Sequence, residues 1–154
     1  MKYIPLTQGK QAIVDDEDFE RVNQWKWCFH KGNNEKNAYA FRFNSIRMHR
    51  FILNVPKGLH VDHINGDTLD NRKKNLRICT QLENNRNTPK RKDTTNKYKG
   101  IHFVKQRNKW IARIQVNGKR IHSGYFNTQE EAARRYDEMA KIHFGNFARL
   151  NFLY

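Results

Sequence analysis

Residues 98–126 constrain the fold of this chain more than any other segment does. Three short runs alternate apolar with polar residues, at about 99–104, 109–116 and 119–125, as half-buried strands do. Asn117-Gly118 joins the second run to the third, and this pair is the strongest short signal for a two-residue hairpin turn. The pattern therefore predicts a three-stranded antiparallel sheet.

A helix is expected directly after that sheet. Thr128 and Glu131 have the spacing of a capping box, and Gly145 stands where a helix commonly ends. One face of the helix should pack on the sheet, because its members recur at helical spacing: Ala132, Tyr136, Met139, Ala140 and His143. The matching side of the central strand is expected to hold Trp110, Ala112, Ile114 and Val116.

Residues 1–88 are expected to form shorter elements. We predict a helix over Asp15–Asn23, with acids in its first turn, and strands at 25–29 and 38–43 around a polar loop that contains Gly32. Residues 46–54 should be helical or irregular, with Met48, Phe51 and Ile52 buried. A strand at 59–64 runs into the Asn65-Gly66 turn, and an apolar strand at 76–79 precedes a short helix that Thr80 and Glu83 cap.

The chain is therefore predicted to be α+β and divided into two domains. The first domain covers residues 1–88, a basic linker covers 89–97, and the second domain covers 98–154. The polar, charged composition of the linker segment, which begins with Pro89, favours a position on or near a polyanion.

Positive charge points to nucleic acid as the partner. The formal net charge is +15, and residues 86–120 contain twelve Lys or Arg and a single acid, Asp93. An acidic membrane is the second candidate, but the sequence has no basic amphipathic helix, lipid motif or apolar run long enough to span a bilayer. Cys28 and Cys79 lie far apart, which argues against a cysteine-rich zinc site and favours reduced thiols in a cytoplasmic protein.

The segment from His60 to Asn84 holds the candidate chemistry. This segment resembles the motif of the HNH endonuclease family. The resemblance is carried by Asp62-His63, by Asn75 directly before Leu76-Arg77, and by Asn84 further along. The likeness covers about residues 46–88 and is strongest to the phage and intron-encoded homing members, in which some motif histidines are replaced by Asp or Asn. It implies an N-terminal ββα-metal nuclease core with its motif at 46–88.

The resemblance also implies a role for each motif residue. His63 would be the general base, Asp62 and Asn84 would bind one divalent metal per active site, and Asn75 would hold the loop and orient the base. Oxygen ligands favour Mg²⁺ or Mn²⁺ over zinc. One carboxylate and one amide make a weak site alone, so we expect weak metal binding without DNA.

Elementary chemistry agrees with these roles and raises one question. Phosphodiester hydrolysis needs an activated water and a cation that absorbs developing charge, and a neutral histidine suits the base near pH 7. Neighbours on a regular strand point to opposite faces. Asp62 and His63 can therefore serve one site only if the strand twists or ends there. Alternatives stay open for the other polar residues of this region. His49 either matches a position often occupied by His in the family that this segment resembles or has a structural role, and His60 would face phosphate from the rim of the site. Arg50, Arg72 and Arg77 would contact the DNA backbone or be solvated.

Residues 98–151 resemble the APETALA2-like (ethylene-response-factor) DNA-binding domain. The matching pieces are YKGI at 98–101, KWIARI at 109–114, the run at 124–140 and GNFARLNF at 145–152. The resemblance implies a sheet that enters the major groove, and strand alternation puts the following residues on its outward face: His102, Lys109, Arg113, Gln115, Arg120 and His122. Lys99, Lys105 and Arg107 would hold phosphates. Lys99, His102 and Gln115 stand where the plant pattern has Arg, so the plant target cannot be transferred.

These features together predict a metal-dependent DNA endonuclease of site-specific or semi-specific homing type. It would act on double-stranded DNA and leave 5′-phosphate and 3′-hydroxyl ends, by nicking unless two chains act together. The alternative is a non-catalytic DNA-binding regulator with a decayed nuclease site. RNA binding is a third hypothesis, which the absence of an RNP-type aromatic pattern opposes. A monomer is favoured, and the location would be the cytoplasm of a bacterial host if the chain is phage-encoded.

Overall fold

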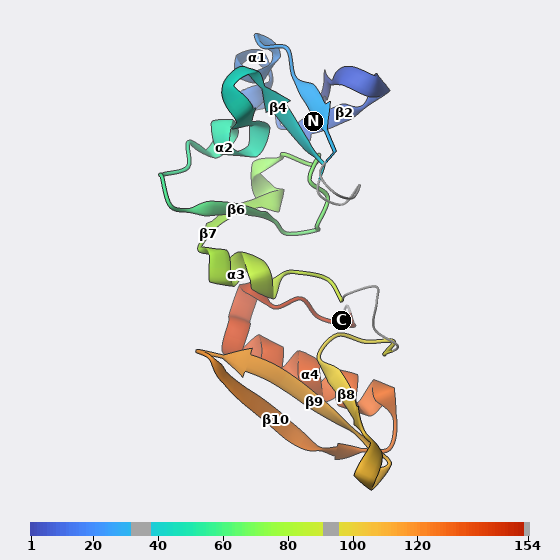
Figure 1. The fold of residues 1–154 in the computed structure, drawn as a ribbon. Helices are drawn as coiled ribbons and strands as arrows, with labels where there is room; N and C mark the ends of the chain where they lie inside the picture. The colour runs from blue at the N-terminus through green and yellow to red at the C-terminus, as the bar shows by residue number, and fades with distance from the viewer. Residues whose placement is uncertain (32–37, 91–95, 153–154) are drawn as a thin grey trace. The chain divides into compact units, whose positions relative to one another are not determined.

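A computed structural model describes residues 1–31, 38–90 and 96–152 of the chain. Over these ranges the fold is α+β, with four small antiparallel sheets and four α-helices (Figure 1). The fold class predicted from the sequence is therefore confirmed. The chain forms two compact units, Met1–Asn84 and Asn85–Tyr154. Among the described residues, no helix has both the length and the apolar character needed to cross a membrane.

The first unit is built from short strands and helices. In chain order they are β1 (Lys2–Pro5), η1 (Thr7–Gly9), β2 (Gln11–Val14), α1 (Asp16–Asn23), β3 (Cys28–His30), β4 (Tyr39–Arg42), η3 (Phe43–Ser45), β5 (Ile46–Arg47), α2 (Met48–Leu53), β6 (His60–His63), η4 (Lys73–Asn75), β7 (Leu76–Cys79) and α3 (Gln81–Arg86), which ends just past the unit boundary. The predicted helix near Asp15 and the paired strands β3 and β4 are confirmed. The predicted polar loop around Gly32 lies outside the described residues.

One hydrophobic core holds the first unit together. Ile4, Val14, Val22 and Met48 are each fully buried in it. The prediction for Phe51 was wrong, because this ring is only half-buried. It packs against Trp27, with centroids 5.9 Å apart, and the guanidinium of Arg42 covers it at 4.8 Å.

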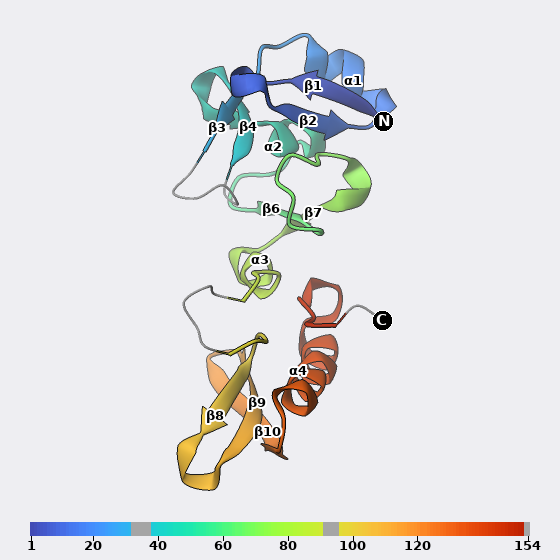
Figure 2. The same ribbon diagram turned by 90° about the vertical axis from the view of Figure 1, so that its right-hand side faces the viewer.

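The second unit is a three-stranded sheet packed on one helix. It contains β8 (Ile101–Val104), η5 (Lys105–Arg107), β9 (Lys109–Val116), β10 (Lys119–Phe126), α4 (Gln129–Phe144) and η6 (Gly145–Phe147). The strand order is β10-β9-β8, and α4 runs along one face of the sheet (Figures 1 and 2). Asn117 and Gly118 have φ of 49° and 79°, as a tight hairpin turn requires. The Thr128/Glu131 capping box is also confirmed.

Close approach of the helix to the sheet explains Gly100. A Cβ atom at this position would lie 2.0 Å from the Tyr136 ring, so only glycine fits. Ala132, Tyr136, Met139 and Ala140 are buried as predicted, but His143 is exposed. That prediction was wrong because Phe144, Ala148 and Leu150 complete the core at this end of the helix.

The segment before the second sheet is described only at its ends. Residues 91–95 of the predicted linker lie outside the described residues. Asn96 Nδ2 donates to Ile101 O over 2.7 Å, and Lys97 N donates to Gln129 Oε1 over 2.9 Å. The C-terminal end of the predicted linker is therefore held within the second unit by these hydrogen bonds.

Candidate active site

The β6–β7 hairpin and the start of α3 present the motif residues (Figure 2). The strands pair antiparallel, with Asp62 opposite Arg77 and His63 opposite Leu76. β6 ends at His63, and Gly66 N donates to His63 O over 2.9 Å to close the turn that follows. The strand thus ends at Asp62 and His63. A strand that twists or ends at this pair was the condition under which both side chains can serve one site.

Asp62 is a buried carboxylate paired with an arginine. Arg77 donates to Asp62 Oδ2 from Nε over 2.8 Å and from Nη2 over 2.5 Å. The Arg77 side chain is 16% exposed and the Asp62 side chain is 7% exposed. Arg77 is therefore not a solvated surface group, and a metal ion at Asp62 must share the carboxylate with this guanidinium or displace it.

His63 is a buried imidazole whose surroundings favour the neutral form. Burial lowers the pKa of His63, against the opposing effects of a hydrogen bond with Asn71 and the charges of Asp62, Asp67 and Asp70. The neutral ring is the form that can take a proton from water.

His49 and Tyr39 enclose the His63 ring, and the sequence did not identify this cluster. The centroid of His63 lies 5.0 Å from that of His49 and 6.1 Å from that of Tyr39. His49 is 3% exposed, and burial, together with the charges of neighbouring residues, lowers its pKa to about 3. The only signal in the sequence was His49 in Met48-His49-Arg50, and no spacing linked it with Tyr39 on another strand.

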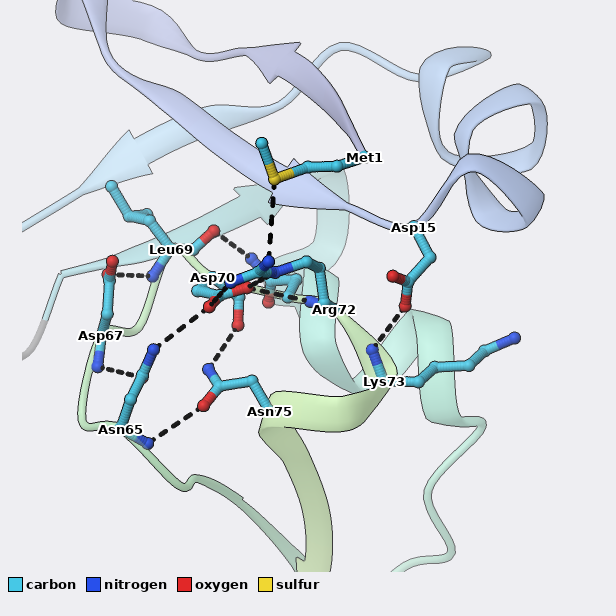
Figure 3. A network of polar contacts seen from close by, with 10 residues as sticks. Met1, Asp15, Asn65, Asp67, Leu69, Asp70, Arg72, Lys73 and Asn75 are labelled. Atoms are coloured by element: carbon cyan, nitrogen blue, oxygen red, sulfur yellow. Dashed lines mark hydrogen bonds and ion pairs between the residues drawn. The ribbon is translucent and has the colours of Figure 1, made fainter.

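Asn75 joins the two sides of the loop between β6 and β7 (Figure 3). Its Oδ1 accepts from Asn65 N over 3.0 Å, and its Nδ2 donates to Asp70 O over 2.8 Å. Asp70 in turn pairs with Arg72 over 2.6 Å. Arg72 is therefore part of the loop's own polar contacts. The role of Asn75 in orienting the base stays a prediction.

The donor set suits a hard divalent cation. Asp62 offers carboxylate oxygens, and Asn84, in α3, offers an amide oxygen. Thr80 and Glu83 cap this helix: Glu83 Oε2 accepts from Thr80 N over 2.8 Å, and Thr80 Oγ1 accepts from Glu83 N over 3.2 Å. Within the described ranges, no group of three or more His, Cys, Asp or Glu side chains is arranged to hold a metal. Substrate phosphate and water would have to supply the other ligands.

Two further candidate residues near the hairpin occupy different environments. Arg50 donates to Leu59 O over 2.6 Å and to Val55 O over 3.2 Å, so it fastens the segment between α2 and β6. His60 is half-buried at the start of β6.

The outward face of the second unit gathers basic and polar side chains. His122 lies opposite Arg113, Arg120 opposite Gln115, and His102 opposite Ile111. Directly opposed residues share a face of a sheet, so these side chains form one surface. Arg113 Nη2 lies 3.5 Å from His102 Nδ1.

The lysines and the remaining arginine of the predicted DNA surface differ in their surroundings. Lys105 and Arg107 are exposed in η5, and Lys109 Nζ donates to Asn127 Oδ1. Lys99 Nζ instead donates to Arg86 O over 2.7 Å and to Thr88 O over 2.6 Å. Burial lowers the pKa of Lys99 to about 8. The Lys99 ammonium therefore contacts backbone carbonyls, which argues against the expected contact with phosphate.

Comparison with known proteins places the hairpin in a nuclease class. The family model described as HNH endonuclease matches residues 54–86, which include β6, β7 and α3. An uncharacterized HNH endonuclease of Acanthamoeba polyphaga mimivirus is 29% identical over 150 residues, covering 94% of this chain and 76% of the viral protein. Protein 3.8 of Escherichia phage T7 is 33% identical over 95 residues, covering 62% of this chain and 78% of the phage protein. The chain belongs to the HNH endonuclease family.

One further relative matches a shorter stretch. Dehydration-responsive element-binding protein 2A of Arabidopsis thaliana is 49% identical over 53 residues, covering 32% of this chain and 16% of the plant protein. No solved structure gives a significant match.

Proposed function

We propose that this chain is a metal-dependent endonuclease that cuts double-stranded DNA, with His63 as its general base. The observation that carries the proposal is the position of His63: a buried imidazole of lowered pKa at the end of β6, directly after the buried Asp62 in the chain. A nuclease needs a proton acceptor of this kind beside a cation-binding oxygen.

In the proposed reaction, His63 removes a proton from a water molecule aligned with the scissile phosphorus. The oxygen of that water forms the new bond to phosphorus as the bond to the 3′-oxygen breaks. The departing 3′-oxygen takes a proton from solvent, so the products are a 5′-phosphate and a 3′-hydroxyl. Asn75 holds the turn that presents His63, through its contacts with Asn65 and Asp70.

Asp62 and Asn84 are the residues proposed to hold one Mg²⁺ or Mn²⁺. The ion would supply positive charge to the developing phosphorane and to the leaving oxygen. Because Arg77 already pairs with Asp62, the protein alone should bind the ion weakly, and DNA phosphate should strengthen the binding.

The second unit is proposed to read DNA sequence as an APETALA2-like domain, over residues 98–154. The support is its sheet of three strands on one helix, the outward row of Arg113, Gln115, Arg120 and His122, and the likeness to a plant protein whose name describes element binding. Arg and Gln suit guanine and adenine in the major groove. A reader joined to a nuclease domain at residues 1–88 fits a site-specific, homing type of enzyme.

One observation favours the alternative function, a DNA-binding regulator with a decayed nuclease site. Arg77 donates two hydrogen bonds to Asp62 Oδ2, an oxygen that the proposed metal ion would need as a ligand. In that case the chain would bind DNA without cutting it.

Conversion of supercoiled plasmid DNA at low salt separates the two functions. Wild type, His63→Ala and a matched control, His143→Ala, are each incubated with Mg²⁺, Mn²⁺ or EDTA. His143 is exposed on α4, so its loss should leave cutting intact. Metal-dependent nicking by wild type and His143→Ala, but not by His63→Ala, supports the enzyme. Binding by all three without nicking supports the regulator.

A further inference from the structure

An exposed aromatic and basic surface lies at one end of the β3–β5 sheet in the first unit. We call it the Phe43 surface, after its most exposed member. Phe43 is 88% exposed and Trp25 is 48% exposed. They line an open hollow of about 430 Å³ together with Lys26, Arg42 and Ile46. Most large apolar side chains of this unit are at least partly buried, so an aromatic ring this exposed suggests a binding role.

The Phe43 surface rests on a fixed platform. The guanidinium of Arg42 lies 4.1 Å from the centroid of the Trp25 ring and 4.8 Å from that of Phe51. β4, which ends at Arg42, pairs with strands on both sides. Phe43 begins the 3-10 turn η3, which ends at Ser45 with a φ of 59°. Because its support is ordered before any partner binds, Phe43 can dock without a large loss of conformational entropy.

The charge of the surface indicates the class of partner. Lys26 and Arg42 line the hollow, and none of its five lining residues is acidic. A second copy of this chain would bring the same positive charges, which disfavours self-association through this face. Duplex DNA offers the complement: phosphates for the cations, and base steps between which an aromatic wedge can insert.

The first unit also links this surface to the candidate active site. Tyr39 begins β4 and touches the His63 ring, with centroids 6.1 Å apart. Phe43 is four residue steps along the chain from Tyr39. At about 3.3 Å per residue in a strand, the backbone distance between them is about 13 Å. The backbone at Phe43 is therefore on the order of 20 Å from the His63 ring, which corresponds to about six base steps of duplex.

We propose that Phe43 inserts between base pairs of duplex DNA within about six base pairs of the cut, while Lys26 and Arg42 hold the flanking phosphates. This inference rests on the proposed function, because it requires that the chain bind and cut DNA. It gives residues of the N-terminal region a direct part in substrate deformation. Unstacking at this step would kink the duplex near the cut.

Permanganate footprinting tests the proposal, because this reagent oxidises thymines that have lost their stacking. The nick made by wild type is first mapped, and a labelled duplex spanning it is then bound in EDTA. The proteins compared are wild type, Phe43→Ala and Tyr3→Ala. Tyr3 is a matched control: an aromatic residue of the same unit, 49% exposed, in β1.

Wild type and Tyr3→Ala should each produce a hyper-reactive thymine within about six base pairs of the nick. Phe43→Ala should lose it and bind about fivefold or more weakly, the effect expected for one lost base–aromatic contact. Phe43→Ala should melt like wild type, because the deleted ring is exposed.

Three outcomes would overturn the proposal. If Phe43→Ala keeps the thymine signal and the affinity while wild type still nicks, only the insertion is wrong. If wild type neither binds nor nicks DNA, the proposed function fails as well. If Phe43→Ala abolishes self-association in sedimentation and leaves DNA binding unchanged, the surface is an interface between copies of the chain.

Discussion

The rings of His49 and His63 meet edge to face, with centroids 5.0 Å apart and planes at 87°. Both residues are buried, and Tyr39 lies against both rings, with centroids 5.3 Å and 6.1 Å away. A proton on either imidazole would place a charge in a poorly solvated cluster and next to the other ring. The arrangement therefore keeps the proposed base neutral and gives its ring a fixed orientation.

Because of this cluster, we expect the free energy of unfolding of the wild-type protein to fall in mild acid. The fall should be smaller when His49 is replaced. The pKa of His49 is lowered from 6.5 to about 3 in the folded protein, so below pH 6.5 the unfolded state binds more protons. Above about pH 6.5, His49 is neutral in both states and does not lower the free energy of unfolding. As the pH falls from 6.5 towards 3, His49 lowers the free energy of unfolding by at most about 1.4 kcal/mol per pH unit.

Urea denaturation from pH 4.5 to 7.5 measures this effect. His49→Gln should give a shallower decline of the free energy of unfolding below pH 6.5 than wild type does. His143→Gln, at an exposed position, should follow the wild-type curve. Equal slopes for His49→Gln and wild type would show that His49 is protonated normally in the folded state.

Replacing Arg77 should make the protein responsive to metal in the absence of DNA. Arg77→Met removes the guanidinium from the buried Asp62 carboxylate, and breaking such a pair typically costs about 3–5 kcal/mol of stability. A divalent cation could then supply the missing positive charge. Thermal melting with and without Mn²⁺ should show a clearly larger metal-induced rise for Arg77→Met than for wild type.

Arg72→Met is the matched control for that experiment. It breaks the ion pair with Asp70 in the same loop, away from the proposed ligands, and should melt at the same temperature with and without Mn²⁺. A similar metal response in both variants, or in neither, would argue against Asp62 as a ligand.

Most secondary structure followed from local patterns in the sequence. Asn117-Gly118 and the Thr128/Glu131 pair each specify a turn or a cap through contacts within four residues, so they could be located without knowledge of the fold. His143 and Phe51 were misassigned because their exposure depends on distant packing. Phe144 takes the core position that the helical spacing gave to His143.

The candidate site was predictable as a list of residues but not as a set of contacts. The motif spacing placed Asp62 and His63 on one strand. Nothing local indicated that Asp62 would pair with Arg77, or that His63 would touch Tyr39 and His49 from other elements. The surroundings of Lys99 were hidden for a related reason, because its position before β8 says nothing about the carbonyls of residues 86 and 88 that it binds.

Asn75→Ala should abolish most nicking even where the protein remains folded. The variant removes a part-buried hydrogen bond from Asn65 N and a buried one to Asp70 O, and leaving a buried group unsatisfied costs about 1–3 kcal/mol. The turn that presents His63 would shift, and a misplacement of about 1 Å can lower a rate about 100-fold. Nicking rates are measured at a temperature where melting shows the variant to be folded.

Val22→Ala provides the comparison for Asn75→Ala. It removes methyl groups from a fully buried position in α1 and destabilises the same unit without touching the turn. It should nick normally at that temperature. If both variants lose activity in proportion to their stability, Asn75 has only a general structural role.

The salt dependence of DNA binding should distinguish Lys105 from Lys99. Lys105 is exposed, so Lys105→Met should reduce the slope of log affinity against log salt by about 1. Lys99→Met should leave the slope unchanged and lower the melting temperature, because the ammonium donates to Arg86 O and Thr88 O. A reduced slope for Lys99→Met would restore this residue to the phosphate contacts.

Arg113→Ala should weaken specific binding by about 1–3 kcal/mol and relax the preference at one base pair. Arg113 lies at the centre of the outward face, opposite His122 in β10 and 3.5 Å from His102, where a bidentate contact with guanine is geometrically suited. Selection from a random duplex library, compared between wild type, Arg113→Ala and Lys105→Met, measures the preference at each position. Lys105→Met should weaken binding to all sequences alike. An unchanged preference profile for Arg113→Ala would mean that the base contacts are made by other residues of this face, with Gln115 and Arg120 the next to replace.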